Sequence, residues 1–278
     1  MYLRPTTLDE AAQALAEGGK VLAGGTDFFP ALGDRPAIGA IIDLSRLAEI
    51  RGISIDAEAV RIGGASTWSE IIISPLPRCF DALKSAAREI GGIQIQNRGT
   101  IGGNLCNASP AADSVPPLLI LDAEVELVSV NSKRRLPLAD YIVGNRKTQR
   151  RPDEILTSVI IPRRVDQASS TFLKLGTRRY LVISIAMVAA LLTADEKGLA
   201  HEVRIAVGAC SVTARRLHEL ERELIGKSIR SGISAYVTPA HLSRLSPIDD
   251  VRATAAYRLD AALTLVRRAL EECAQGLS

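Results

Sequence analysis

The sequence lacks the patterns of an iron–sulfur or zinc protein. It has only four cysteines among 278 residues, and none of them pair at Cys-x-x-Cys spacing or suggest a disulfide framework. The three histidines begin at His201 and follow no metal-ligand spacing, so we interpret them as surface or partly packed residues. We predict that the chain binds no metal itself, and a histidine-dependent catalytic triad is hard to place.

Signals for nucleic acid or membranes are also missing. The net charge is +3, from 34 basic and 31 acidic residues, which gives no field strong enough to favour nucleic acid or an acidic membrane surface. No run of about 18 apolar residues occurs, and Met1–Thr7 has no apolar signal core. We therefore expect no membrane span and a reducing, cytoplasmic setting.

The length and composition indicate a globular protein of two or three domains. Hydrophobic residues make up 47% of the chain and charged residues 23%. The chain turns polar near Pro162–Ser170, so we place a domain boundary there. We expect an α+β N-terminal domain over residues 1–165, with subdomains of about 1–55 and 56–165, and a C-terminal domain over residues 166–278.

Local patterns predict the elements of the N-terminal part. Thr7 and Glu10 have the spacing of a capping box, and so do Thr67 and Glu70, so a helix should follow each threonine. Pro116-Pro117 suits the first turn of another helix. The other expected elements are strands at Lys20–Ala23, Ala40–Asp43, Gly52–Ile55, Val60–Gly63, Glu124–Val130 and Ile155–Ile161, and a helix at Phe80–Ile90.

The C-terminal part should combine a small antiparallel sheet with helices. Two apolar runs, Ile183–Ala194 and Glu202–Ala209, flank a turn sequence, which predicts a hairpin. Helical periodicity appears in Ala214–Ile225 and Asp249–Cys273. The apolar stripe of the second helix is typical of the core of a helical bundle.

A short apolar strand runs directly into Gly24-Gly25-Thr26. The glycines let the backbone approach a ligand or adopt positive φ, and amide N–H groups that point one way suit phosphate oxygens. A tight turn without a ligand is the alternative explanation.

Residues Arg98–Asn104 repeat these ingredients in a second glycine-rich stretch. Neither stretch is a dinucleotide-binding GxGxxG or a P-loop. Two such loops would close on a pyrophosphate from opposite sides, neutralising it with dipoles and hydroxyls rather than with a lysine. Asp113 follows, either as a plain N-cap or as an acceptor for ribose or ribityl hydroxyls.

These two stretches resemble the flavin-binding signatures of one family. AGGTD at 23–27 and NRGTIGGNLCNASPAAD at 97–113 are similar to those of the FAD-binding, or medium, subunits of the xanthine dehydrogenase and aerobic carbon monoxide dehydrogenase superfamily. The second signature is long and specific. The resemblance runs nearly end to end, through Phe172–Arg179 and Ala256–Arg258 among others.

The resemblance implies a fold and a task. The fold is a vanillyl-alcohol-oxidase or PCMH-type FAD-binding domain of two α+β subdomains, followed by a C-terminal CO-dehydrogenase-flavoprotein-like domain. The task is that of an oxidoreductase subunit of a molybdenum hydroxylase, a flavoprotein for electron transfer. Electrons would pass from a molybdopterin large subunit to 2Fe-2S clusters on a small subunit, and from these clusters to non-covalent FAD on this chain. The FAD would then pass the electrons to an external acceptor.

The resemblance also implies site residues, all of them cofactor-binding and none catalytic. The first signature contributes Leu22, Ala23, Gly24, Gly25, Thr26 and Asp27, and the second contributes Thr100, Gly102, Gly103, Asn104 and Asp113. Ile90 and Leu156 would give apolar contacts. Lys174 would lie near the isoalloxazine, where a cation stabilises negative charge, and Tyr180 would cover the flavin face. An exposed strand residue and a core aromatic are the respective alternatives for these last two.

One departure bears on the electron acceptor. NAD-reducing members of the family carry acidic residues after Arg178-Arg179, whereas this chain reads Tyr180-Leu181-Val182, which argues against direct NAD reduction. Quinone, cytochrome, oxygen and NAD stay open as acceptors. The main alternative function is a self-contained FAD-dependent oxidase or reductase, which needs an acid/base group beside the flavin. A non-enzymatic nucleotide-binding module is the third hypothesis.

Overall fold

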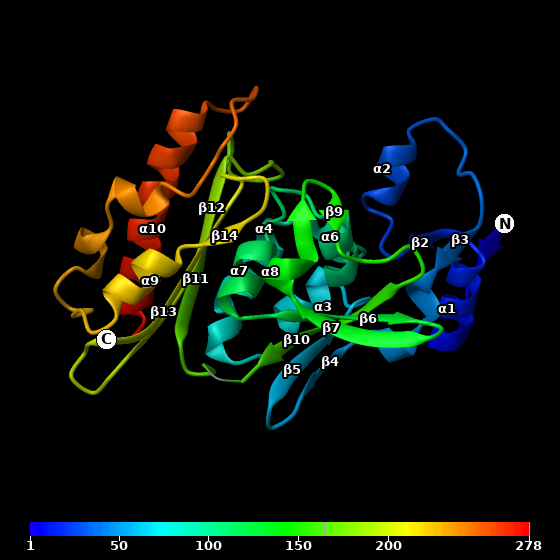
Figure 1. The fold of residues 1–278 in the computed structure, drawn as a ribbon, viewed down its shortest axis with the longest axis horizontal. Coiled ribbons are helices and arrows are strands. Elements are labelled where there is room, and N and C mark those ends of the chain that lie inside the picture. The colour runs from blue at the N-terminus through cyan, green and yellow to red at the C-terminus, as the bar shows by residue number, and fades with distance from the viewer. Residues whose placement is uncertain (164, 278) are drawn as a thin grey trace. The chain divides into compact units, whose positions relative to one another are not determined.

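The computed structural model describes residues 1–163 and 165–277, which form two compact units (Figure 1). The N-terminal unit comprises Met1–Ser74, Gly91–Ser109 and Asp122–Arg163. The C-terminal unit comprises Pro75–Ile90, Pro110–Leu121 and residues 165–277. The chain therefore alternates between the units before it completes the second. None of the helices in the described residues is long and apolar enough to cross a lipid bilayer.

A small parallel sheet opens the N-terminal unit. Its strand order is β1-β3-β2, with β1 at Tyr2–Leu3, β2 at Lys20–Leu22 and β3 at Ile41–Asp43. Helix α1 (Leu8–Ala16) begins at the predicted capping box and packs its buried Ala11 and Leu15 into the same core as β3. A strand–helix–strand connection of this kind makes the neighbouring strands parallel, so all three strands end at one edge of the sheet.

The N-terminal unit also contains a five-stranded antiparallel sheet, in the order β4-β5-β10-β6-β7. These strands are β4 (Ile53–Ile55), β5 (Ala59–Gly63), β10 (Ile155–Pro162), β6 (Glu124–Ser129) and β7 (Ser132–Pro137). The helices and the small hairpin are α2 (Phe28–Leu32), α3 (Trp68–Ile73), α5 (Ile93–Gln96), α6 (Ile101–Asn107), α8 (Leu138–Tyr141), β8 (Ile142–Gly144) and β9 (Lys147–Thr148), with 3-10 turns η1 (Leu44–Arg46) and η2 (Ala48–Ile50).

One expectation for this unit is wrong. The second glycine-rich stretch is not a loop beyond Thr100, because residues from Ile101 onward form α6. Gly102 serves the packing of this helix: a Cβ there would lie 2.6 Å from the Gly64 carbonyl oxygen. The second capping box is confirmed at the start of α3.

A buried carboxylate on β6 organises the polar face of the five-stranded sheet. Glu126 is 1% exposed and pairs with Arg61, with Lys133 at 3.1 Å and with Arg135 at 3.2 Å. Its burial opposes ionisation, but the hydrogen bonds from Arg61 and Lys133 outweigh this and lower the pKa of Glu126 to about 2. Two of these cations sit on edge strand β7, whose alternating polar residues gave no apolar signal in the sequence.

The C-terminal unit is built on an antiparallel sheet that is covered on both faces. The strands are β11 (Ser169–Leu175), β12 (Ala186–Ala194), β13 (Ala200–Gly208) and β14 (Arg215–Arg216), in that order. Helix α10 (Ala255–Gln275) packs on β11 and β12, while α4 (Asp81–Glu89) and α7 (Val115–Ile120) also contact this sheet. Burial from both sides explains why β12 is almost continuously apolar.

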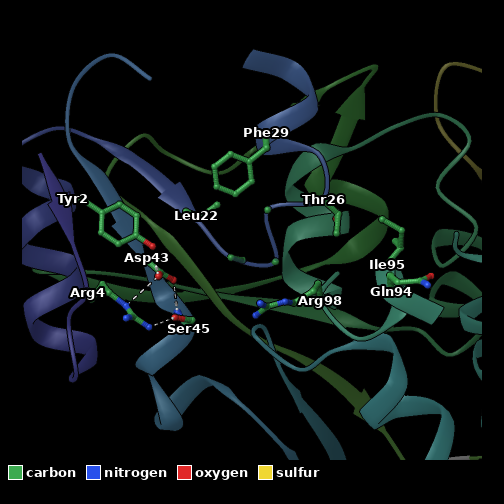
Figure 2. A pocket seen from close by; sticks show the side chains of 13 residues that line it. Tyr2, Arg4, Leu22, Thr26, Phe29, Asp43, Ser45, Gln94, Ile95 and Arg98 are labelled. Atoms are coloured by element: carbon green, nitrogen blue, oxygen red, sulfur yellow. Dashed lines mark hydrogen bonds and ion pairs between the residues drawn. The ribbon is translucent and has the colours of Figure 1, made fainter. Parts of the chain in front are cut away.

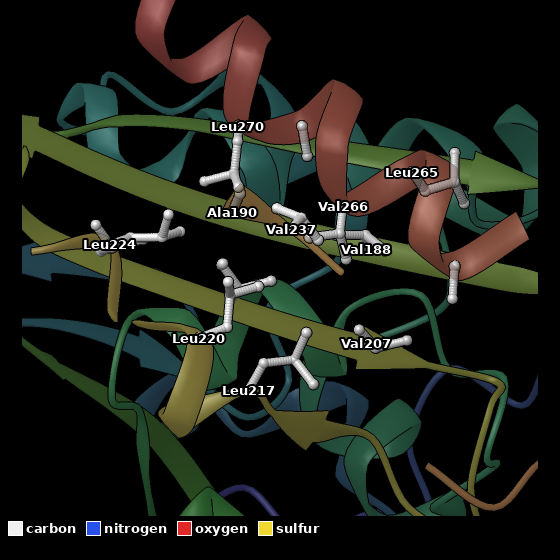
Figure 3. Packing of buried hydrophobic residues seen from close by; sticks show 14 of the residues in the cluster. Val188, Ala190, Val207, Leu217, Leu220, Leu224, Val237, Leu265, Val266 and Leu270 are labelled. Carbon is white, nitrogen blue, oxygen red and sulfur yellow. The ribbon is translucent and has the colours of Figure 1, made fainter. Parts of the chain in front are cut away.

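The main core of this unit lies between the sheet and α10. Val188 and Ala190 of β12 meet Val266 and Leu270 of α10, as Figure 3 shows. The predicted hairpin is confirmed, but α10 packs on a sheet rather than in a helical bundle. The remaining helical segments are α9 (His218–Leu224), η3 (Arg78–Phe80), η4 (Ile233–Tyr236) and η5 (Pro239–Leu242). Helix α9 is shorter than the predicted Ala214–Ile225, because the chain first forms β14.

A buried arginine ties α10 to the rest of the C-terminal unit. Arg258 is 3% exposed, and its guanidinium donates to the Ile185 carbonyl oxygen at 2.6 Å and to the Ala209 carbonyl oxygen at 3.2 Å. It also pairs with Asp250 at 2.7 Å. Arg258 therefore joins the helix to the start of β12, the end of β13 and the preceding loop.

Candidate functional site

A cavity of about 550 Å³ lies in the N-terminal unit, at the carboxyl edge of its parallel sheet. Arg4, Ser45 and the segment Ala23–Thr26 follow β1, β3 and β2 closely, and all line this cavity (Figure 2). Because parallel strands end at the same edge, three distant segments meet there, and ligands commonly bind at this edge of a parallel sheet. The volume lies within the usual range of ligand pockets, about 300–1,000 Å³.

The first glycine-rich stretch forms one wall. Gly25 has a φ of +77°, and an added Cβ would lie 2.8 Å from the ring of Phe29, so this position requires glycine twice over. The backbone amides of Gly24, Gly25 and Thr26 donate no hydrogen bond to any residue that the structure describes. Free amide donors beside a cavity suit an anion.

The second stretch contributes only its first residue, Arg98, to the cavity lining, and Gln94 and Ile95 of the preceding α5 line the cavity beside it. The Arg98 carbonyl oxygen lies only 2.0 Å from where a Cβ on Gly24 would be. The prediction that the two glycine-rich stretches lie together is therefore confirmed. Gly24 is needed for this close approach.

An ion-pair network closes the end of the cavity near β1 and β3. Asp43 accepts hydrogen bonds from the Tyr2 hydroxyl at 2.5 Å and the Ser45 amide at 2.9 Å, and Arg4 lies 3.3 Å away. Burial opposes ionisation of Asp43, but these contacts outweigh it and lower the pKa of its carboxyl group. The sequence predicted dipoles and hydroxyls rather than a lysine at this site; no lysine lines the cavity in the described residues, but Arg4, Asp43 and Arg98 do.

Several predicted residues of the N-terminal unit lie outside the cavity lining. Thr100 caps α6 by accepting from the Gly103 amide at 3.1 Å, and the Gly102 and Asn104 amides donate to main-chain carbonyls. The amides of Gly102, Gly103 and Asn104 are therefore already used within the fold. Asp27 is the N-cap residue of α2.

Leu156 lies behind the second stretch rather than in the cavity. It is 5% exposed on β10, and its carbonyl oxygen would be 2.3 Å from a Cβ on Gly64. Gly64 in turn contacts α6 at Gly102. Leu156 thus supports the packing of α6 through these two glycines.

Asp113 and Lys174 meet in the C-terminal unit. The Lys174 ammonium lies 2.6 Å from Asp113 Oδ2, and the Ser184 hydroxyl donates to Asp113 Oδ1 at 2.5 Å. Both side chains of the ion pair are less than a tenth exposed, so Lys174 is not an exposed strand residue. Burial raises the pKa of Asp113, although Lys174 and Ser184 act in the opposite direction.

Two residues of the C-terminal unit that were predicted to bind the cofactor, Ile90 and Tyr180, make few contacts that bear on this role. Ile90 is the C-cap residue of α4 and is half-buried. Tyr180 is 60% exposed, and the Arg179 guanidinium lies 5.3 Å from its ring centroid. Tyr180 is therefore not a core residue, and its role and that of Ile90 stay predictions.

The sequence analysis missed much of the cavity lining: Tyr2, Arg4, Phe29, Asp43, Ser45, Gln94, Ile95 and Arg98. A usable signal existed for Ser45, since it closely follows the predicted strand Ala40–Asp43, whereas no strand was predicted before Arg4. Within residues 1–163 and 165–277, no group of three or more His, Cys, Asp or Glu side chains is arranged to bind a metal ion.

Comparison with known families matches most of the chain to two family models. Residues 1–164 match the model of the FAD binding domain in molybdopterin dehydrogenase, and residues 171–273 match that of the CO dehydrogenase flavoprotein C-terminal domain. The xanthine dehydrogenase FAD-binding subunit of Escherichia coli O157:H7 is 32% identical, over 98% of this chain and 94% of that protein.

Solved structures agree with these matches. Quinoline 2-oxidoreductase from Pseudomonas putida 86 has a chain with a TM-score of 0.91 and 26% identity, covering 99% of this chain and 96% of that one. Reconstituted CO dehydrogenase from Oligotropha carboxidovorans has a chain with a TM-score of 0.90 and 26% identity, covering 99% and 97%. The chain therefore belongs to the family of FAD-binding medium subunits of xanthine dehydrogenase and CO dehydrogenase type.

Proposed function

We propose that this chain binds FAD with its diphosphate against Ala23–Thr26 and serves as the electron-transfer subunit of a molybdenum hydroxylase. The observation that carries the proposal is the row of free amides at Gly24, Gly25 and Thr26, which lines a cavity at the carboxyl edge of a parallel sheet. Family membership supports FAD as the ligand. When bound, FAD supplies the redox chemistry, and the protein supplies binding, orientation and electrostatics.

The residues of the cavity fit a dinucleotide diphosphate. In the described part of the chain, the main-chain N–H groups of Gly24, Gly25 and Thr26 are free beside the cavity, which is the usual geometry of a phosphate site. The missing side chains of Gly24 and Gly25 make this arrangement possible, because the Arg98 main chain and the Phe29 ring fill the space that a Cβ would take. Thr26 adds a hydroxyl donor beside the amides.

The other predicted cofactor-binding residues would hold the parts of FAD beyond the diphosphate. Asp113 and Lys174 are assigned to the flavin nucleotide by resemblance, and their ion pair fixes the position of both groups in a buried environment. We assign Thr100, Asn104 and Leu156 to the same site as supports of the second signature. The proposed set is completed by Leu22, Asp27, Ile90, Gly102, Gly103 and Tyr180.

We also propose the finer architecture and setting. Residues 1–165 would form a vanillyl-alcohol-oxidase or PCMH-type FAD domain and residues 166–278 the second domain, which the ranges of the two family models support. The four cysteines are free thiols, which supports a cytoplasmic location. Partner subunits would carry 2Fe-2S clusters and molybdopterin, and an external acceptor would remove the electrons.

The test is to titrate the purified full-length chain with FAD and record flavin absorbance and fluorescence. We expect saturable binding of FAD and much weaker binding of riboflavin, which has no phosphate. A chain that never takes up FAD would contradict the proposal. Co-purification of iron–sulfur and molybdopterin subunits tests the partners, whereas turnover of a small substrate by the isolated chain would favour a self-contained enzyme.

A further inference from the structure

The cavity of the N-terminal unit contains one cation that has no partner among the residues the structure describes. Two arginines and one aspartate are the charged residues that line it, so its formal charge is +1. Arg4 is tied to Asp43 at 3.3 Å. The Arg98 guanidinium forms neither a hydrogen bond nor an ion pair with any described residue, so the excess charge is located on Arg98.

The main chain of Arg98 is held firmly at the contact between the two glycine-rich stretches. Its amide donates to the Ile95 carbonyl oxygen at 3.1 Å, and the following Gly99 amide donates to the same oxygen at 2.6 Å. Its own carbonyl oxygen lies against Gly24. In Figure 2 the Arg98 side chain extends from this anchored backbone across the cavity toward Ser45.

The amides of Ala23–Thr26 are dipoles and carry no net charge, whereas a diphosphate diester carries two negative charges. Taking an anion out of water is costly unless a counter-charge is near. A guanidinium can donate two parallel hydrogen bonds to phosphate oxygens, which makes arginine well suited to this role.

We infer that Arg98 is the cationic contact to the diphosphate of the bound cofactor, facing the uncharged amides of Gly24–Thr26 across the cavity. This inference rests on the proposed function and adds a charged binding residue to it. Arg98 would thereby make the site selective for phosphorylated flavins over riboflavin.

The experiment compares FAD and riboflavin binding to the full-length wild-type chain, R98Q, R98K and the control R46Q. Arg46 lies in the same unit, is exposed and does not line the cavity, so R46Q matches the charge lost in R98Q. Dissociation constants are measured by flavin fluorescence at two NaCl concentrations, and the melting temperature of each cofactor-free variant checks its fold.

We expect R98Q to raise the FAD Kd about tenfold, the lower end for a charge-assisted hydrogen bond because Arg98 is exposed. R98K should fall between R98Q and wild type, R46Q should match wild type, and riboflavin binding should not change. The FAD Kd of R98Q should also depend less on salt than that of wild type.

If the wild-type chain binds FAD and R98Q binds it with the same Kd, the inference is overturned and the proposed function stays intact. Equal weakening of FAD and riboflavin would overturn it too, because the contact would then not be to phosphate. If R98Q does not fold, an unchanged FAD Kd in R98K together with a salt-independent wild-type Kd overturns it. A wild-type chain that binds no FAD ends the proposed function itself.

Discussion

Replacing Gly24 by alanine tests the geometry on which the proposed site depends. The new Cβ would lie 2.0 Å from the Arg98 carbonyl oxygen, whereas real Cβ atoms essentially never come closer than 3.0 Å. Both groups belong to the main chain, so no side chain can rotate away. The two walls of the cavity must therefore separate by about 1 Å, the difference between these distances.

Two effects of different size should follow. Overpacking of this kind costs about 1–3 kcal/mol of unfolding free energy, and we expect the upper end because backbone must move. A displacement of about 1 Å also exceeds the spread of hydrogen-bond lengths. Losing two such bonds to the diphosphate, at roughly 1–1.5 kcal/mol each, raises the FAD Kd about 100-fold.

The assay is urea denaturation of the cofactor-free chain together with fluorescence titration of FAD. Gly39→Ala is the matched control, since it adds the same methyl group in the same unit with nothing within 4 Å. Its φ of +89° disfavours alanine, so we expect a loss of about 1–2 kcal/mol in stability and no change in FAD affinity. If G24A binds FAD as tightly as wild type, the two stretches do not grip the diphosphate together, and the reasoning is refuted.

Three further predictions test the buried charged groups of the two units. R258A should lower the free energy of unfolding in urea by about 3 kcal/mol, because buried acceptors lose their donor, and a loss below about 1 kcal/mol would contradict this. D113N should cost about 3 kcal/mol by leaving the buried Lys174 ammonium without its carboxylate, against about 1 kcal/mol for S184A; equal effects would argue against a buried ion pair. The lowered pKa of Glu126 means that its contribution to stability is complete above the usual value of 4.5 and is lost as the pH falls toward 2. E126Q should therefore flatten the decline of the urea midpoint over that range, and an unchanged decline would exclude this carboxylate as a source.

The sequence alone determined the local elements and the family. The capping boxes at Thr7 and Thr67, the proline-opened α7 and the β12–β13 hairpin depend on interactions within a few residues, so local patterns suffice to predict them. The long second signature was specific enough to identify the family. The glycines of the first stretch line a cavity, as a backbone that approaches a ligand would require, although the sequence alone also allowed a simple tight turn there.

Tertiary structure decided which distant residues meet. The sequence could not show that α4 and α7 leave the N-terminal half to cover the sheet of the C-terminal unit, because that depends on contacts far apart along the chain. Gly102 likewise pointed to a phosphate loop, yet it serves helix packing against Gly64, which no local pattern encodes. The net charge of the cavity was also decided by tertiary structure. Only the fold brings Arg98 next to Gly24 and pairs Arg4 with a carboxylate, which leaves one guanidinium to meet an anion.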